Sequence, residues 1–417
     1  MKSPRSPLTI TVGSLLSVSL VQGIQVDSSF QATVPNGTVH AIALAPDGSV
    51  WIGGEFDSVN GQNARSLAKL TSSGVVDTTS ALSINGSVFS LAFDSAGKPV
   101  AGGTFGIAST GWLLPADGRV LSLVVDPNGN IIAGGTFWSQ PDVFVCQLRT
   151  SGAVDPAFKS GLKLNLSMEA GANVVAVQPD GKILVGGNFD TAAGFASLAR
   201  LNANGSVDPS FCHQHGPILY PKALVVLADG KILVGGTADS SGRGFVRQLN
   251  SDGSVDTSFA EVTCDQAVEA LAVDSVGRVI VGGSFTHLNG VERPRLARLN
   301  AQGNADASWD IGANNVVKAL AIGPDGDVFV GGAFTELSGL PHSGIARLRE
   351  FNAMASTAQA NLSLAGTTAG LTYTIESSTD LTTWTEYRRD VAGLNGLSIR
   401  ATTTLGPRLF FRARPVE

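Results

Sequence analysis

The stretch "CHQH" places three residues that could bind a metal within four positions, namely Cys212, His213 and His215. Thiolate and imidazole groups are ligands that zinc prefers, but a structural zinc site uses four of them, and no second pair lies nearby in the sequence. We therefore expect ordinary loop residues here and no bound metal. In an oxidising compartment a disulfide between Cys212 and Cys264 is an alternative. Cys146, in "VFVCQL", is expected to be a small apolar strand residue.

Residues 249–256, "LNSDGSVD", hold the Asn, Asp and Gly residues that are typical of a calcium-binding loop. A loop of the EF-hand type would need a carboxylate where Gln248 stands, and arginine occupies the equivalent positions 200 and 298. Hairpin turn chemistry explains the same residues. The sequence also lacks a Gly-rich phosphate loop, a Gly-x-Ser-x-Gly elbow and a His-Glu-x-x-His motif. The motifs therefore assign no catalytic residue and no cofactor.

The elements that position these residues come from a repeat, which is plainest over 174–211 in "VVAVQPDGKILVGGNFDTAAGFASLARLNANGSVDPSF". Two apolar runs around a Pro-Asp-Gly turn, then "SLARLN", an Asn-Gly turn and "VDPSF" predict four antiparallel strands. Gly-Gly pairs mark seven copies and begin at Gly53, Gly102, Gly134, Gly186, Gly235, Gly282 and Gly331. Their spacing is 47 to 52 residues, except for 32 between Gly102 and Gly134. We interpret these pairs as sites of close backbone packing between neighbouring copies.

One four-stranded sheet cannot bury both of its faces, so the copies must stack, and this period is typical of propeller blades. We predict an all-β fold with a seven-bladed β-propeller over 25–351. The shortened second copy has only "GWLLPADGR" after "VAGGTF" and is expected to lack its outermost strand. The last copy ends at "GIARLRE", whereas "QVDSSF" at 25–30 precedes the first copy. The N-terminal strand is therefore predicted to complete blade seven; in an alternative phase every blade begins with this strand.

A pattern of polar side chains supports the same register. A basic or amide residue stands eight positions before an Asp in five copies: Lys69 and Asp77, Gln147 and Asp155, Arg200 and Asp208, Gln248 and Asp256, Arg298 and Asp306. With a three-residue hairpin loop, such positions face each other across two strands. Arg347 has no such partner in its own copy, so we predict that it faces Asp27 and that this pair closes the ring. Cross-strand pairing is favoured over a ring of catalytic carboxylates.

The consensus "ALAV.PDGKILVGG.F......LARLN..GSVD.SF" resembles the delta-60 repeat β-propeller family of bacterial surface and secreted proteins. The resemblance covers about 26–350, although the second copy departs from it. It implies a propeller and export, and it brings no catalytic residues. In 352–417 the Gly-Gly pairs stop, and "YTIESSTDLTTW" resembles the small β-sandwich found at the C-terminus of many exported bacterial proteins. That likeness implies a spacer, an attachment point or a sorting signal.

Residues 1–24 predict a secretory signal peptide, because Lys2 and Arg5 precede the mostly apolar "LTITVGSLLSVSLVQG". A strand is the alternative, since apolar residues alternate between Ile10 and Leu20. The segment is too short and too rich in Ser and Thr to span a bilayer, so we expect no membrane span. We also expect a monomer that is secreted or at the cell surface. The net charge of -6 and the pI near 5.4 argue against a nucleic-acid partner.

The meander puts the Asp-Gly and Asn-Gly turns on one rim and the longer, variable loops on the other, where recognition usually resides. The candidate ligand rim comprises the aromatic and histidine residues of these loops: Trp138, Phe195, His213, His215, Tyr220, His287 and His342. The predicted function is a non-enzymatic binding or adhesion scaffold for a glycan or a cell-surface protein. The alternatives are a hydrolase or lyase that acts on an extracellular polysaccharide at the channel mouth, and a purely structural spacer.

Overall fold

The computed structural model describes residues 9–12, 21–78, 84–114, 118–136, 144–163, 171–191, 194–211, 220–353, 357–365, 372–378, 385–391, 397–404 and 410–415. The described residues form strands and turns and no helix, so none of them belongs to a membrane-spanning helix. The chain divides into two compact units, Ile24–Glu350 and a second one made of residues 1–23 and 351–417. The larger unit contains the repeats.

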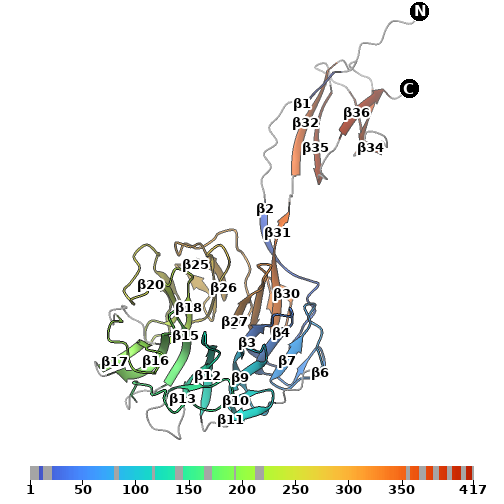
Figure 1. Ribbon diagram of the computed structural model, residues 1–417. Helices are drawn as coiled ribbons and strands as arrows, with labels where there is room; N and C mark the ends of the chain where they lie inside the picture. Colours follow the sequence, from blue (N-terminus) through green and yellow to red (C-terminus); the bar gives the residue numbers. More distant parts are fainter. Residues whose placement is uncertain are drawn as a thin grey trace, which may run out of the picture. The chain divides into compact units, whose positions relative to one another are not determined.

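The larger unit consists of antiparallel sheets that follow one another in chain order (Figure 1). From the inner strand outward, the sheets are β3 (Thr38–Leu44), β4 (Val50–Glu55) and β7 (Leu67–Leu70); β8 (Val88–Phe93), β9 (Pro99–Gly103), β10 (Gly106–Ser109) and β11 (Trp112–Leu114); β12 (Arg119–Val125), β13 (Ile131–Thr136) and β14 (Val145–Leu148); and β15 (Gly171–Val177), β16 (Ile183–Thr191) and β17 (Gly194–Leu201).

The later sheets continue this arrangement. They are β18 (Tyr220–Val226), β19 (Ile232–Thr237) and β20 (Gly244–Leu249), extended by β21 (Val262–Cys264), β24 (His287–Leu288) and β25 (Val291–Glu292); β22 (Val268–Val273), β23 (Val279–Gly283) and β26 (Leu296–Leu299); and β27 (Val317–Ile322), β28 (Val328–Gly332), β31 (Ile345–Ala353) and β2 (Val21–Val26). Two short hairpins lie in the loops, β5 (Ser58–Val59) with β6 (Gln62–Asn63), and β29 (Glu336–Leu337) with β30 (Leu340–Pro341).

The fourth strand of the repeat is much shorter than expected. It pairs with the third strand through single bridges such as Leu201 with Val207 and Leu249 with Val255. The following Asp ends the strand, because its carboxylate accepts the N–H and the hydroxyl of the Ser two residues later, as Asp208 does from Ser210 (2.9 and 2.7 Å). Such a local turn competes with the β ladder.

The inner strands pack against one another in sequence. Contacts run from β3 through β8, β12, β15, β18 and β22 to β27, and β27 in turn contacts β3, which lies beside it in Figure 1. The first glycine of each Gly-Gly pair makes this approach possible: a Cβ on Gly235 would lie 2.8 Å from Val268 of the next sheet, and one on Gly331 would lie 2.8 Å from Val39. The interpretation of these pairs as close packing sites is therefore confirmed.

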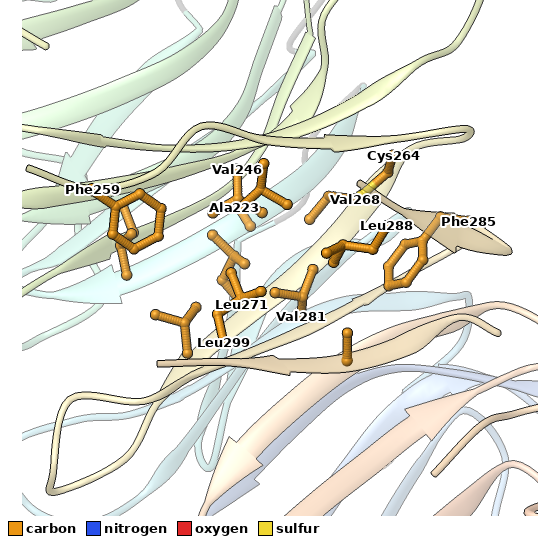
Figure 2. Packing of buried hydrophobic residues seen from close by; sticks show 14 residues of the cluster. Ala223, Val246, Phe259, Cys264, Val268, Leu271, Val281, Phe285, Leu288 and Leu299 are labelled. Carbon is orange, nitrogen blue, oxygen red and sulfur yellow. The ribbon is translucent and has the colours of Figure 1, made fainter. Parts of the chain in front are cut away.

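Apolar side chains fill the space between successive sheets. Figure 2 shows one cluster, in which Ala223 and Val246 of one sheet meet Leu271, Val281 and Leu299 of the next. The apolar runs of the inner and second strands face neighbours on both sides, which explains why they are continuous rather than alternating.

The second sheet corrects one prediction. Copy two was expected to lack its outermost strand, but the sheet keeps four strands, in the order β11-β10-β9-β8. Only two residues, Thr104 and Phe105, separate β9 from β10, and two more, Thr110 and Gly111, separate β10 from β11. The missing length therefore comes from the loops between strands.

The smaller unit contains two sheets among its described residues. One has the order β1 (Thr9–Val12), β32 (Thr357–Ala365), β35 (Leu397–Thr404), and the other has the order β34 (Thr385–Val391), β33 (Thr372–Ser378), β36 (Phe410–Pro415). In the segment predicted as a signal peptide, residues 9–12 form an edge strand, with Ile10 opposite Leu364. Residues 1–8 and 13–20 lie outside the described residues.

Candidate functional site

The structure describes four members of the candidate ligand rim. Trp138, His213 and His215 lie outside the described residues, as does Cys212. Phe195 stands on β17 opposite Asp190, and Tyr220 is the half-buried first residue of β18. No hydrogen bond, ion pair or ring contact within the described ranges joins Tyr220, His287 and His342 to one another.

His287 belongs to a loop clamp. Asp265 accepts the backbone N–H groups of Thr286 (2.8 Å) and His287 (3.0 Å), and the imidazole Nδ1 of His287 lies 3.4 Å from its Oδ2. Burial would raise the pKa of Asp265, but these donors more than offset it and hold the pKa well below its usual range. Asn314 makes the same contacts with Thr335 and Glu336 in the next loop. His287 is thus fixed beside a structural clamp.

A shallow groove of about 460 Å³ lies on the same rim. Arg295, Asp310 and Asn314 line it together with Glu336 and Ser338 of the β29–β30 hairpin. Arg295 donates to the carbonyl of Ala313 (3.2 Å), so its guanidinium also stabilises the loop that contains Ala313.

A second set of residues comes from irregularities at the beginning of the inner strands. In each inner strand the pairing with the second strand skips one residue, as between Val39 and Ala41 or between Val268 and Ala270. The second glycine of the Gly-Gly pair lies opposite this bulge: a Cβ on Gly236 would lie 2.2 Å from the carbonyl oxygen of Tyr220. Bulges of this kind turn a side chain out of the strand and are common beside functional sites.

The skipped residues form what we call the bulge ring: His40, Phe89, Leu121, Asn173, Lys222, Glu269 and Lys318. All of them are half-buried, although the residues that precede them are buried. Because the inner strands contact each other in order, the ring takes one side chain from each of the seven inner strands of the larger unit. It lies at the end of the inner strands that the variable loops enter.

One half of the bulge ring carries charges. Glu269 accepts from Lys222 Nζ at 2.5 Å through Oε1 and from Lys318 Nζ at 3.2 Å through Oε2. Burial would raise the pKa of Glu269, but the two ammonium groups outweigh it and lower the pKa below its ordinary value. Glu269 is therefore ionised at neutral pH.

His40 follows Lys318 in the ring. Its buried Nε2 has no hydrogen-bond partner among the described residues and lies 3.9 Å from Glu55 Oε2. Burial lowers the pKa of His40, and the Lys318 ammonium acts in the same direction. The imidazole is consequently neutral at pH 7 and keeps an unused polar atom.

The other half of the ring is uncharged. The rings of Phe89 and His40 meet edge to face with centroids 5.4 Å apart, and the guanidinium of Arg119 lies 5.9 Å from the centroid of Phe89. Leu121 and Asn173 complete this half. The ring therefore offers cations, an aromatic side chain and an amide.

The pair Asp27 and Arg347 lies away from the bulge ring, where strands three and four of the repeat make ionic contacts. Arg347 Nε donates to Asp27 Oδ2 (2.8 Å), and Asp27 N–H donates to the carbonyl of Arg347 (2.8 Å). Arg347 Nη1 also donates to the carbonyl of Ser72 in the first sheet (2.8 Å). Its guanidinium lies 5.3 Å from the ring centroid of Phe30.

The same arrangement recurs in other sheets. Lys69, Arg200, Gln248 and Arg298 contact Asp77, Asp208, Asp256 and Asp306, respectively. Gln147 is different, because its amide donates to Asp126 (3.2 Å) while Asp155 accepts from Arg149 (2.9 Å). This repetition marks the contacts as structural.

Cysteine and metal chemistry find little support in the described residues. Cys264 is a free thiol buried in the cluster of Figure 2, and burial raises its pKa to about 12. Burial likewise raises the pKa of the Cys146 thiol to about 12. Within the described ranges, no group of three His, Cys, Asp or Glu side chains could hold a metal ion.

Sequence reasoning missed the bulge ring. The signal was present in the repeat: the residue before the bulge is Val in five of the described inner strands, and the residue after it is Ala or Ser in six, whereas the residue between them differs from sheet to sheet. The position looked like an ordinary strand residue until the pairing showed that it is skipped.

Comparison with known proteins supports the fold. A family model described as a domain of unknown function (DUF5122), beta-propeller, matches residues 45–79, 127–158, 178–211, 227–259, 277–308 and 323–350. These repeats are β-propeller repeats. The matched segments leave out the short second copy and the residues after 350. No curated protein has significant sequence similarity to the chain.

Among solved structures, the WD40 beta propeller domain of Doa1 is 13% identical with a TM-score of 0.50, and the match covers 80% of this chain and 99% of that one. The extracellular domain of a protein assigned to the hybrid two component systems of B. thetaiotaomicron is 12% identical with a TM-score of 0.50, covering 94% of this chain and 55% of that one. A virginiamycin B lyase from Staphylococcus aureus is 11% identical with a TM-score of 0.48, and the match covers 78% of this chain and 99% of that one. At these identities the likeness concerns the fold alone.

Proposed function

We propose that residues 25–351 form a seven-bladed propeller that binds a glycan or a cell-surface protein outside the cell without catalysing a reaction. The N-terminal strand closes the last blade, residues 1–24 direct export, and residues 352–417 form a small β-sandwich for attachment. The ligand lies at the channel mouth, over the bulge ring and the neighbouring variable rim.

The bulge ring carries this proposal. Its side chains come from separate sheets, lie half-buried at the ends of the inner strands, and present different chemistry at one repeat position. A rigid frame with variable residues at a single position is typical of recognition sites.

The state of Glu269 argues against the alternative of a hydrolase in this ring. Glycoside hydrolysis of the common type needs one carboxylic acid that donates a proton, so its pKa must be raised. The two lysines lower the pKa of Glu269 instead. A carboxylate held in this way binds and orients, but it does not act as the acid.

Binding of the purified full chain to an array of glycans and polysaccharides, with release of shortened sugars measured for every hit, tests this function. We expect binding without release, and about tenfold weaker binding by Phe89→Ala, which removes an aromatic contact. Val276→Ala, at an exposed turn on the other rim, serves as the control and should bind like the unmodified chain. Release of shortened sugars would contradict the proposal. If no glycan or polysaccharide of the array bound, a cell-surface protein would remain as the ligand.

A further inference from the structure

The charged residues of the bulge ring do not behave like the structural ion pairs of this chain. The structural pairs recur from sheet to sheet at the same repeat positions, as in Arg200 with Asp208 and Arg298 with Asp306. Lys222, Glu269 and Lys318 instead occupy a position that is apolar, aromatic or amide in other sheets. The repeat therefore folds without charges at this position, and their presence in three successive sheets calls for another explanation.

The exposure of the three side chains shows which charge a ligand would meet. The side chain of Glu269 is only 12% exposed, whereas those of Lys222 and Lys318 are 34% and 30% exposed. Each ammonium group uses one of its three N–H donors on Glu269 and keeps others for a further acceptor. The buried carboxylate thus holds two cations side by side, and the cations face outward.

The balance of charge around the ring is positive. Among the described residues that contact the ring or belong to it, there are three cations, Lys222, Lys318 and Arg119, and two carboxylates, Glu269 and Glu55, while His40 is neutral. The whole chain, in contrast, has a net charge of -6. The positive charge of the bulge ring attracts a small acidic group. A long polyanion such as a nucleic acid would be repelled by the acidic surface of the rest of the protein.

We propose that the bulge ring binds an acidic sugar residue of a glycan, with Lys222 and Lys318 holding its acid group and Phe89 and Asn173 contacting the sugar ring. This inference rests on the proposed binding function and specifies its ligand. Lysine ammonium groups act as point charges and can donate hydrogen bonds to either a carboxylate or a sulfate. The side chains of Phe89 and Asn173 suit the apolar face and the hydroxyl groups of a pyranose, respectively.

Two pairs of matched polysaccharides test the inference on the full chain: polygalacturonate against its fully methyl-esterified form, and dextran sulfate against dextran. Each pair shares a sugar backbone and differs in charge. We expect the acidic member of at least one pair to bind at least about tenfold more tightly than its neutral partner, with affinity that falls as salt rises. Preference for polygalacturonate identifies a carboxylate as the acid group, and preference for dextran sulfate identifies a sulfate.

Single variants then assign the binding to the ring. Lys222→Ala and Lys318→Ala are each expected to weaken binding of the preferred acidic polysaccharide about tenfold, because each loses one charge-assisted contact while the other lysine still neutralises Glu269. Lys98→Ala, at an exposed turn on the opposite rim, is the matched control and should bind normally. Near-UV circular dichroism of each variant checks that it is folded.

The outcomes separate the two proposals. Equal binding of acidic and neutral polysaccharides, or binding that Lys222→Ala and Lys318→Ala leave unchanged, would overturn the acidic-sugar inference while the binding function stands. Failure of all four polysaccharides and of the glycan array to bind would overturn both the inference and the glycan ligand.

Discussion

At the scale of single residues, Arg347 joins three parts of the chain. Its guanidinium contacts Asp27 before the first repeat, Ser72 in the first sheet and the ring of Phe30. Loss of one partner of a buried pair usually lowers stability by about 3–5 kcal/mol. Here Arg349 Nη1 also lies 3.2 Å from Asp27 Oδ2 and compensates part of the carboxylate charge.

We therefore expect Arg347→Met to lower the free energy of unfolding by about 2 kcal/mol, less than for a carboxylate left without any cation. Urea denaturation of the purified chain measures this change. Arg65→Met is the control, since Arg65 is exposed and lies 3.8 Å from an exposed Asp57; its effect should stay below about 0.5 kcal/mol. An Arg347→Met protein as stable as the unmodified chain would show that these contacts contribute nothing to the stability of the fold.

The strand-four aspartates predict how stability depends on pH. Burial would raise the pKa of Asp27 and of Asp306, but the N–H and hydroxyl groups of the following Ser and the facing Arg lower both pKa values below the ordinary one. A depressed carboxylate pKa stabilises the fold above the unfolded-state value near pH 3.9, and this stability is lost as the pH falls toward the folded-state pKa.

The urea midpoint should accordingly fall as the pH is lowered from 5 to about 2.5. Asp306→Asn removes one of these titrating groups, so its midpoint should fall less steeply over the same range. Equal slopes for the two proteins would mean that Asp306 titrates alike in the folded and unfolded states.

At the scale of strands, the Gly-Gly pair builds both the packing and the candidate site. The first glycine admits the next sheet, and the second admits the carbonyl group that the bulge turns toward it. Sequence reasoning found the packing role, because it follows from a pattern repeated along the chain. It missed the bulge, because a skipped residue is defined only by the register of two paired strands.

Gly236→Ala tests this coupling. The added Cβ would lie 2.2 Å from the carbonyl oxygen of Tyr220, so the start of β18 must shift, and Lys222 stands two residues further on. We expect the free energy of unfolding to fall by about 1–3 kcal/mol, as in other overpacked positions. Thermal unfolding followed by circular dichroism measures it.

Gly323→Ala provides the comparison, because its Cβ would lie 3.4 Å from the nearest atom, an ordinary contact with Phe329. Its stability should stay within about 0.5 kcal/mol of the unmodified chain. If Gly236→Ala were equally harmless, the close approach of Gly236 to the bulge would not be needed for the fold.

At the scale of the whole molecule, the repeat predicted the order of the sheets, but it did not predict the lengths and structures of the loops. The second copy shows why: the sequence revealed its missing residues, but only strand pairing showed that the loops had shortened while all four strands remained. Likewise, three of the rim residues chosen for their chemistry lie outside the described residues, and no hydrogen bond, ion pair or ring contact within the described ranges joins Tyr220, His287 and His342. A repeat in the sequence predicts the strands that recur in every copy, whereas a binding site depends on the residues that differ between copies.

The segment before the first repeat connects the last sheet to the first. Val34 N–H donates to the carbonyl of Ser343 (2.8 Å), and Gln31 N–H donates to the carbonyl of Ser73 (3.0 Å). Phe30 is 2% exposed, and its ring packs edge to face against Phe329 with centroids 5.5 Å apart. Burial of Phe30 and Val34 contributes roughly 3–6 kcal/mol, which is a large share of the stability of an ordinary domain.

A chain that lacks residues 1–34 should therefore unfold at a clearly lower temperature and bind hydrophobic dyes, because the edge of β31 and the core around Phe329 become exposed. A synthetic peptide of residues 21–36, added in trans, should raise the melting temperature in a saturable manner, since it supplies β2 and the segment that follows it. A peptide with Phe30→Ala and Asp27→Ala is the control and should restore little. If the shortened chain melted like the full one, the first and last sheets would associate without this segment, and closure by the N-terminal strand would be wrong.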